Sequence, residues 1–334
     1  GGGPRSAAIE PRHNTGIARR AILPHHPPPH RERMSPSTAL RHLVTLVATT
    51  FALAGAAQAD EVVLQEAGGT VVSTTLQIDG VDYPADWYLP SGPALGFAVV
   101  EHGFTRQCAN QRETTRELMD RCQMALCLTV PMAGGNPALA DALAERLVSG
   151  VLAPDGRTPP ERIVVGGHSA GGHFASRLGA KLATIAPQRL AGAVLFDPVA
   201  ATGFADQLST LSAAGLRPVL AITSNPSGCN ANNNADPGLR RVRSEALAAG
   251  RDGFVGVQLI DRSTHVDSEG NDTNLLGTVA CRQGWPRAFN VTYLRTLAAA
   301  WALDLVSGTR SAEFYPGGGY VEGMLALQDA RLID

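Results

Sequence analysis

The sequence predicts an α/β fold in which a mainly parallel sheet is covered by helices on both faces. From residue 97 to residue 305, apolar runs of strand length alternate with segments of helical periodicity. The strand-like runs are apolar throughout, which is typical of strands buried on both faces. The sharpest local signal is the pentapeptide Gly167-His168-Ser169-Ala170-Gly171, which lies between one such run and a helical segment.

This pentapeptide has the pattern Gly-x-Ser-x-Gly. Residues 161–166 in front of it form an apolar, β-branched run, and Phe174, Leu178 and Leu182 behind it recur every fourth residue, as on one face of a helix. Where a strand turns sharply into a helix the two backbones approach closely, so glycines are needed on both sides of the turn. The pattern therefore predicts a nucleophile elbow, with Ser169 exposed at its apex above the positive end of the helix.

The first 59 residues are expected to lie outside the catalytic domain. Residues 1–33 are crowded with Pro, Arg and His and are predicted to be a disordered upstream segment. Residues 34–59 have the pattern of a secretory signal peptide, with Arg41, an apolar run over 43–57 and the small-x-small sequence Ala57-Gln58-Ala59. The apolar run of about 15 residues is short for a membrane span, although a membrane anchor is the alternative. Residues 60–334 are predicted to form a single catalytic domain.

Charge and composition exclude some partners. Residues 1–59 hold seven arginines and two acidic residues, which leaves 21 basic and 28 acidic residues and a net charge of −7 for the remainder. An acidic chain without basic clusters does not favour nucleic acid or anionic membranes. A small-molecule substrate is expected, no stable membrane insertion follows signal cleavage, and the oligomeric state is left open.

Five cysteines suggest two disulfides and one free thiol in an exported protein. Cys127 lies inside the apolar run 125–130, so it is predicted to be the buried free thiol. The expected bridges then join Cys108 to Cys122 and Cys229 to Cys281. A secreted or periplasmic location follows from the signal peptide and the cysteines together.

The remaining elements follow from the pattern in chain order. Strand-like alternation over 71–78 and 82–89, with a turn at Gly80, predicts an antiparallel pair at the edge of the sheet. Further strands are predicted over 97–101, 125–130, 190–196, 217–223 and 255–260. Helices are predicted over 114–122, 137–147, 237–249 and 291–305, and residues 311–334 have no assigned role.

A serine nucleophile needs a base and an orienting carboxylate near it. In such a sheet ligands collect at the carboxyl ends of the strands. His265 lies just past the strand 255–260, and Asp197 directly follows the strand 190–196. His102 lies at the end of the first central strand, His168 inside the elbow and His173 in the first turn of the helix, so His265 is the predicted base. Asp197 is the predicted acid, because Asp236 lies further into an Asn-rich loop and Asp261 belongs to the strand of the base itself.

The developing oxyanion needs backbone N–H donors. The amide of Ala170 follows from the elbow, and the amide of Phe104 is the natural second donor in the loop 102–105. Thr105, His168 and Val199 are expected to contact the substrate.

Together these residues are similar to the α/β-hydrolase superfamily over roughly residues 95–305. The resemblance is carried by His102-Gly103-Phe104, by Gly167-His168-Ser169-Ala170-Gly171-Gly172, by Asp197-Pro198-Val199 and by His265. The acid one strand earlier than usual resembles chlorophyllases and esterases of the platelet-activating-factor acetylhydrolase type. Chlorophyllases typically carry a basic residue where this chain has Ala170, so the resemblance implies the triad and not the substrate.

The predicted function is hydrolysis of carboxylic esters by an exported serine hydrolase through an acyl-enzyme, with no metal or organic cofactor. An amidase or peptidase with the same triad is one alternative, and a non-catalytic binding protein on the same fold is another. The polar loops 230–236 and 267–274 have the composition of loose calcium ligands without the ordered spacing of a calcium loop, and are predicted to be solvated.

Overall fold

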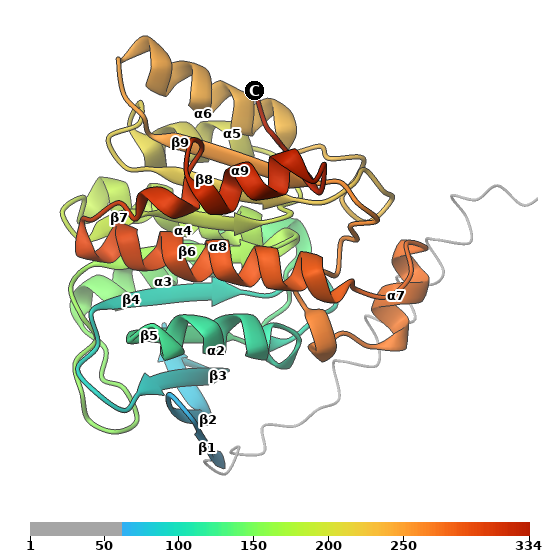
Figure 1. Cartoon of the computed structure of the whole chain (residues 1–334). Helices are drawn as coiled ribbons and strands as arrows, with labels where there is room; N and C mark the ends of the chain where they lie inside the picture. Colours follow the sequence, from blue (N-terminus) through green and yellow to red (C-terminus); the bar gives the residue numbers. More distant parts are fainter. Residues whose placement is uncertain (1–61) are drawn as a thin grey trace, which may run out of the picture. The chain divides into compact units, whose positions relative to one another are not determined.

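A computed structural model of the chain describes residues 62–334 (Figure 1). The predicted signal peptide and the segment upstream of it lie outside the described residues. The described residues 62–334 form one compact unit. Its ten strands form one sheet in the order β1-β2-β3-β5-β4-β6-β7-β8-β9-β10. The strands are β1 (Val62–Glu66), β2 (Gly69–Ile78), β3 (Val81–Pro90), β4 (Gly96–Glu101), β5 (Gln123–Leu128), β6 (Ile163–His168), β7 (Leu190–Phe196), β8 (Val219–Thr223), β9 (Phe254–Leu259) and β10 (Ala330–Leu332).

The six neighbouring strands β5-β4-β6-β7-β8-β9 run parallel to one another, as the fully apolar runs predict. The antiparallel pair β2–β3 is also confirmed, and its two-residue turn Asp79-Gly80 has positive φ at both positions, as a tight hairpin turn requires. β1 pairs outside β2 and forms the actual edge. At the other edge, β10 pairs antiparallel with β9.

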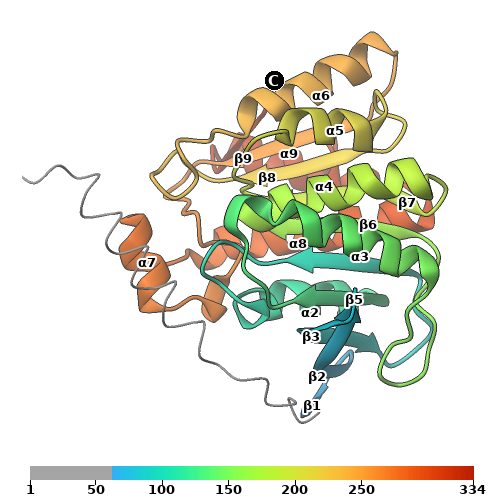
Figure 2. The same ribbon diagram turned by 180° about the vertical axis from the view of Figure 1, so that it is seen from behind.

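Helices cover both faces of this sheet (Figures 1 and 2). The helices are α2 (Arg112–Asp120), α3 (Pro137–Ser149), α4 (Ala170–Ile185), α5 (Phe204–Ser212), α6 (Asp236–Ala248), α7 (Leu275–Cys281), α8 (Ala288–Ser307) and α9 (Gly319–Ala326). The helices α2, α8 and α9 lie in front of the sheet in Figure 1, and the helices α3, α4, α5 and α6 lie in front of it in Figure 2.

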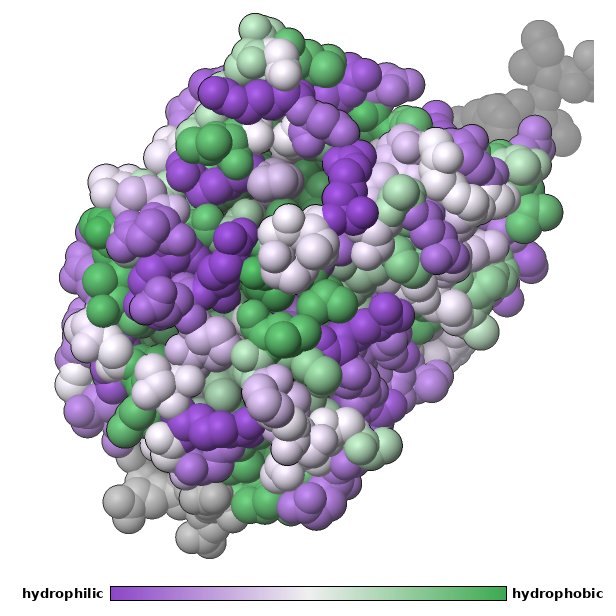
Figure 3. Space-filling model, turned by 60° about the vertical axis from the view of Figure 1, so that its left-hand side comes forward, coloured by the Kyte–Doolittle hydropathy of each residue, from purple (hydrophilic) through white to green (hydrophobic). Residues whose placement is uncertain are grey.

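Two apolar cores follow from this layering, because successive strand residues point to opposite faces. In β4, Phe97 and Val99 pack in the core under α3 to α6, while Ala98 and Val100 pack in the core under α8. On the outside, the face in Figure 3 carries small hydrophobic clusters interspersed with hydrophilic residues. The carboxyl ends of the six parallel strands therefore lie on the same side of the molecule.

Besides β1, four elements were not predicted. α5 and α7 lie in segments to which the sequence analysis assigns no element, and residues 311–334 supply α9 and the edge strand β10. α9 packs Val321 and Met324 into the core with α8. The C-terminal segment therefore completes the sheet and covers one of its faces.

The predicted pairing of Cys108 with Cys122 is wrong. Cys108 is bonded to Cys127, with their Cα atoms 5.7 Å apart, and the exposed Cys122 is the free thiol. The strands β4 and β5 are parallel, and Cys108 follows the carboxyl end of β4. Cys127 lies near the carboxyl end of β5, whereas Cys122 precedes its amino end, about 17 Å away at 3.3 Å per residue. The bridge between Cys229 and Cys281 is as predicted.

Candidate active site

Ser169 stands at the junction between β6 and α4 in a sparsely populated backbone conformation, with φ of 57° and ψ of −122°. Such strain at a non-glycine residue costs about 1–3 kcal/mol and persists only where the surroundings enforce it. A methyl group on Gly171 would collide with the carbonyl oxygens of Glu101 and His102 in the adjacent strand. A methyl group on Gly167 would collide with the carbonyl of Gly171. The close approach inferred from the sequence is therefore present at both glycines.

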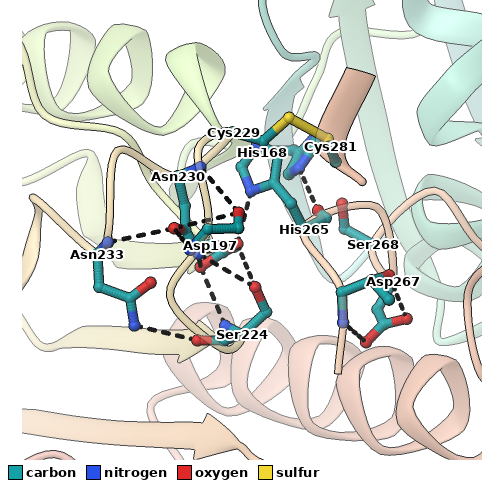
Figure 4. A network of polar contacts seen from close by, with 12 residues as sticks. His168, Asp197, Ser224, Cys229, Asn230, Asn233, His265, Asp267, Ser268 and Cys281 are labelled. Atoms are coloured by element: carbon teal, nitrogen blue, oxygen red, sulfur yellow. Dashed lines mark hydrogen bonds and ion pairs between the residues drawn. A yellow bond between two sulfur atoms is a disulfide. The ribbon is translucent and has the colours of Figure 1, made fainter. Parts of the chain in front are cut away.

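Asp197 and His265 lie against each other although 68 residues separate them, and both are labelled in Figure 4. Asp197 directly follows β7, and His265 lies six residues beyond β9. His265 Nδ1 donates to Asp197 Oδ2 at 2.6 Å. Both side chains are about 95% buried, so water competes little for this bond. The bond fixes the tautomer of the imidazole and leaves Nε2 as the acceptor.

The structure adds two side chains around Asp197 that the sequence analysis missed. Ser224 Oγ donates to Asp197 Oδ2 at 2.6 Å and the Ser224 amide donates to Oδ1 at 3.0 Å. Asn230 Nδ2 lies 3.2 Å from Oδ2, and Asn233 Nδ2 donates to the carbonyl of Ser224 (Figure 4). The carboxylate therefore accepts bonds from three side chains, Ser224, Asn230 and His265, which hold its orientation.

The prediction that His168 contacts the substrate is not supported, because its side chain is 2% exposed. Its Nε2 donates to the carbonyl of His265 at 2.7 Å, and the two rings lie 4.5 Å apart between centroids. Burial lowers the pKa of His168 well below the usual range, and the neighbouring His265 lowers it further. A neutral His168 thus ties the elbow to the backbone of the predicted base.

The remaining contact of the predicted triad would join Ser169 Oγ to His265 Nε2, and among residues 62–334 it is not formed as a hydrogen bond. The prediction that Ser169 is exposed is wrong, because the residue is only 7% exposed where β6, the loop after β4 and the start of α4 meet. Hydrogen bonds of this kind are commonly long before substrate binds and tighten in the reacting complex.

His102 and His173 are fixed by other contacts. Both ring nitrogens of His102 are engaged, with the carbonyl of Gly103 at 2.8 Å and the amide of Val130 at 3.2 Å, and burial lowers its pKa to about 4. His173 Nδ1 accepts from the amide of Ala201 at 2.8 Å. These contacts hold both rings in place, and His265 remains the candidate base.

The loop after β4 lies directly over the serine. A methyl group on Gly103 would come within 3.1 Å of Ser169 Cβ. Among the described residues, no acceptor is hydrogen-bonded to the amides of Phe104 or Ala170. Phe104 is 53% exposed. The unpaired amides of Phe104 and Ala170 thus belong to two segments that meet at Ser169, and they remain the predicted oxyanion donors.

Thr105 and Val199 are placed differently from His168. Thr105 is exposed and has a positive φ of 58°, next to Phe104. Val199 is partly exposed, and its amide donates to the carbonyl of Ser169 at 3.0 Å. Both residues remain in positions from which they can meet a ligand at Ser169.

A buried ion pair joins the loop that follows β4 to the loop that follows β9. Arg106 Nε and Nη2 donate to the two carboxylate oxygens of Glu269 at 2.8 and 2.6 Å. The side chains are 7% and 0% exposed. Arg106 Nη1 also donates to Asn274, the residue that caps α7. Since Arg106 lies two residues after Phe104 and Glu269 four residues after His265, this pair fixes the distance between two parts of the site.

The prediction of solvated loops over 230–236 and 267–274 is wrong for several of their residues. Asn230 and Glu269 are fully buried and Asp267 is 1% exposed, because each bonds to groups that support the site. Asp267 accepts from the amide and hydroxyl of Thr264 at 2.8 and 2.9 Å, and burial raises its pKa to about 6. Within residues 62–334 no cluster of three or more His, Cys, Asp or Glu side chains is arranged to hold a metal ion.

Two surface cavities lie away from these residues. One of about 540 Å³ is lined by Val72, Leu89 and Arg157, and one of about 210 Å³ by Leu247 and Ile333. Neither touches Ser169, so the chemistry of the side chains, and not the size of a cavity, points to the site. Over the described part of the chain, every helix is too short or too polar to cross a membrane.

The strand order, the helices on both faces and the strained serine between β6 and α4 define an α/β-hydrolase fold. Among solved structures, the chain is similar to an S-formylglutathione hydrolase from Agrobacterium tumefaciens, with 14% identity over 73% of this chain and 98% of that one and a TM-score of 0.49. It is also similar to a thermostable carboxylesterase cloned from a metagenomic library (17% identity, 82% and 98% covered, TM-score 0.46). A third similar structure is a dienelactone hydrolase from Anabaena variabilis, with 14% identity over 73% of this chain and 97% of that one and a TM-score of 0.47. No protein-family model and no curated protein matches the chain.

Proposed function

We propose that this chain is a serine hydrolase that cleaves carboxylic esters through an acyl-enzyme. The observation that carries the proposal is the 2.6 Å bond between Asp197 and His265, formed at the carboxyl ends of strands beside the strained Ser169. A metal centre or an organic cofactor is not needed for this chemistry.

In the first half of the reaction, Ser169 Oγ attacks the ester carbonyl carbon while His265 Nε2 takes the hydroxyl proton. The C=O electron pair moves onto oxygen, and the amides of Phe104 and Ala170 hold the negative charge. Collapse of the tetrahedral species breaks the bond to the alcohol, which leaves with the proton from His265. Asp197 stabilises the imidazolium throughout and keeps its own charge.

In the second half, water attacks the acyl-enzyme with His265 again as the base. The acid is released and the serine regains its proton. Loss of one oxyanion donor in hydrolases costs about 3–4 kcal/mol in the barrier, so the two amides are a large part of the proposed rate enhancement. Thr105 and Val199 are proposed to contact the substrate.

Two other functions use the same residues. An amidase or peptidase would need the same triad and protonate an amine leaving group. A binding protein on this fold would keep the fold without turnover. The three bonds to Asp197 favour a catalytic site, because a binding protein has no need of a buried, oriented carboxylate next to an imidazole.

The branch of the α/β-hydrolase superfamily and the cellular compartment are each proposed from a single kind of observation. Asp197 at the end of β7, followed by Pro198 and Val199, supports the resemblance to chlorophyllases and to esterases of the platelet-activating-factor acetylhydrolase type. The bridges Cys108–Cys127 and Cys229–Cys281 support a secreted or periplasmic protein, since disulfides persist in oxidising compartments.

The test compares matched p-nitrophenyl esters and p-nitroanilides of increasing acyl length with the full chain. Ester turnover above amide turnover, lost in Ser169→Ala and in His265→Gln, supports the proposal. Equal turnover of the anilides supports the amidase. A folded chain that turns over no activated ester contradicts both enzymes and leaves the binding protein.

A further inference from the structure

The short helix α7 has its polarity inverted. Its small and polar residues Gly277, Thr278 and Cys281 are buried against the protein. Its exposed face carries Leu275 (66% exposed), Leu276 (65%), Val279 (62%) and Ala280. At 100° per residue these four positions fall on one side of the helix, opposite the three buried ones. A surface helix normally turns its apolar stripe toward the core, so this arrangement calls for another explanation.

The inverted helix is held in place from three sides. Cys281 is bonded to Cys229, Asn274 caps the helix by accepting from the amide of Gly277, and Asn274 also accepts from Arg106. A methyl group on Gly277 would collide with the Arg106 guanidinium, so the helix backbone rests directly on that side chain. The apolar face is therefore a fixed feature of the surface.

This face adjoins the mouth of the candidate site. Arg106, on which α7 rests, lies two residues after the exposed Phe104. At the other end of α7, Gln283 accepts from the amide of His265 at 2.9 Å. In Figures 1 and 2, α7 stands out from the layered body on the side toward which the arrow of β4 points. Whatever covers the face of α7 thus lies beside the loops that carry Phe104 and His265.

The charge of the segment around α7 indicates which kind of partner binds its exposed apolar face. Residues 274–289 contain two arginines, Arg282 and Arg287, and no acidic residue, and both arginines are exposed. The segment also holds Trp285, which is 57% exposed. Leucine and tryptophan beside arginine is the composition of segments that lie in a lipid interface. The charge of −7 over residues 60–334 disfavours anionic surfaces in general, but none of its acids lies in this segment.

We propose that the exposed face of α7, together with Trp285, Arg282 and Arg287, docks on an anionic lipid surface. The leucines and Val279 enter the apolar boundary while the arginines meet the anionic headgroups. Docking in this orientation brings the mouth of the candidate site to the surface of the lipid. The inference goes beyond ester hydrolysis and stands without it.

Tryptophan fluorescence tests the proposal at one position. Of the three tryptophans, Trp87 and Trp301 are 1% and 0% exposed, so Trp285 alone is open to quenchers. The full chain carrying Ser169→Ala, which cannot form an acyl-enzyme, is mixed with vesicles of phosphatidylcholine and phosphatidylglycerol whose acyl chains are brominated. Quenching of emission that disappears in Trp285→Phe is the expected result.

The variant Leu275→Ser/Leu276→Ser/Val279→Ser is expected to weaken this partitioning by at least about tenfold, because three apolar side chains no longer leave water for the lipid. Leu216→Ser/Leu247→Ser is the matched control. These leucines are 64% and 58% exposed but precede the amino ends of β8 and β9, whereas α7 follows the carboxyl end of β9. They are expected to leave partitioning unchanged, and an unaltered circular dichroism spectrum shows that each variant folds.

Three results would overturn the proposal. The first is no quenching of Trp285 by brominated lipid. The second is equal vesicle binding by the triple variant, which places the contact elsewhere in the chain. The third is a dimer in sedimentation without lipid, abolished by the triple variant, which assigns the face to a second copy. None of these results depends on whether Ser169 is a nucleophile, so the esterase proposal can fail separately.

Discussion

Removal of Arg106 alone should strongly destabilise the protein, because Glu269 would remain as a fully buried, unpaired carboxylate. Breaking one partner of a buried ion pair costs about 3–5 kcal/mol, whereas replacing both partners by apolar side chains of similar volume is often nearly neutral. We therefore expect Arg106→Met to lower the free energy of unfolding by about 3–5 kcal/mol. Arg106→Met/Glu269→Met should recover most of that loss. The coupling free energy should thus exceed about 2 kcal/mol.

Urea unfolding of the four proteins of this double-mutant cycle, followed by tryptophan fluorescence, measures these values. The deficit of Arg106→Met should shrink at pH 5 relative to pH 8, because the unpaired carboxyl group can take up a proton. It should change little with salt, since buried pairs are poorly screened. A deficit below about 1 kcal/mol, or a double variant as unstable as the sum of both single variants, would refute the reasoning.

Three further predictions concern single residues around the site. With protein that has not been reduced, Ellman's reagent should titrate one rapidly reacting thiol, absent in Cys122→Ser; a reactive thiol that survives this change contradicts the pairing of Cys108 with Cys127. Burial raises the pKa of Asp267 to about 6 in the folded protein, so the folded state binds the proton more tightly and loses stability as the pH rises from about 4 to 6. Relative to Asp267→Asn, wild type should lose about 3 kcal/mol over that range in urea unfolding, and parallel pH profiles would contradict it. Ser224→Ala removes a 2.6 Å bond to the Asp197 carboxylate and should lower kcat/KM for esters about tenfold without a change in fold, while an unaltered kcat/KM would show that Asn230 alone suffices.

The sequence predicts the parts of the site that depend on strand ends. Asp197 and His265 each follow a buried parallel strand, and parallel strands end at one edge, so their contact could be expected from the order of the strands. The glycines of the elbow were predictable for a different reason, because the close approach of strand and helix backbones leaves no room for a side chain at Gly167 and Gly171.

The rest depends on loop conformations that leave no periodic signal. Ser224 and Asn230 reach Asp197 from an irregular loop, and only their position after β8 hinted at a role. α7 is seven residues long, and its apolar face points outward, so the usual inward periodicity is missing. The bridge from Cys108 to Cys127 could have been predicted from the sequence. Cys108 follows the carboxyl end of β4, and in the parallel neighbour β5 Cys122 lies at the amino end and Cys127 near the carboxyl end.

The central claim is that Ser169 is a nucleophile activated by His265. The most direct measurement is the intact mass of the full chain after incubation with a fluorophosphonate, followed by peptide mapping of the adduct. The account predicts one phosphonyl group on the peptide containing Ser169, absent in Ser169→Ala and formed far more slowly in His265→Gln. An adduct on any other residue, or no adduct on a folded chain, would contradict it.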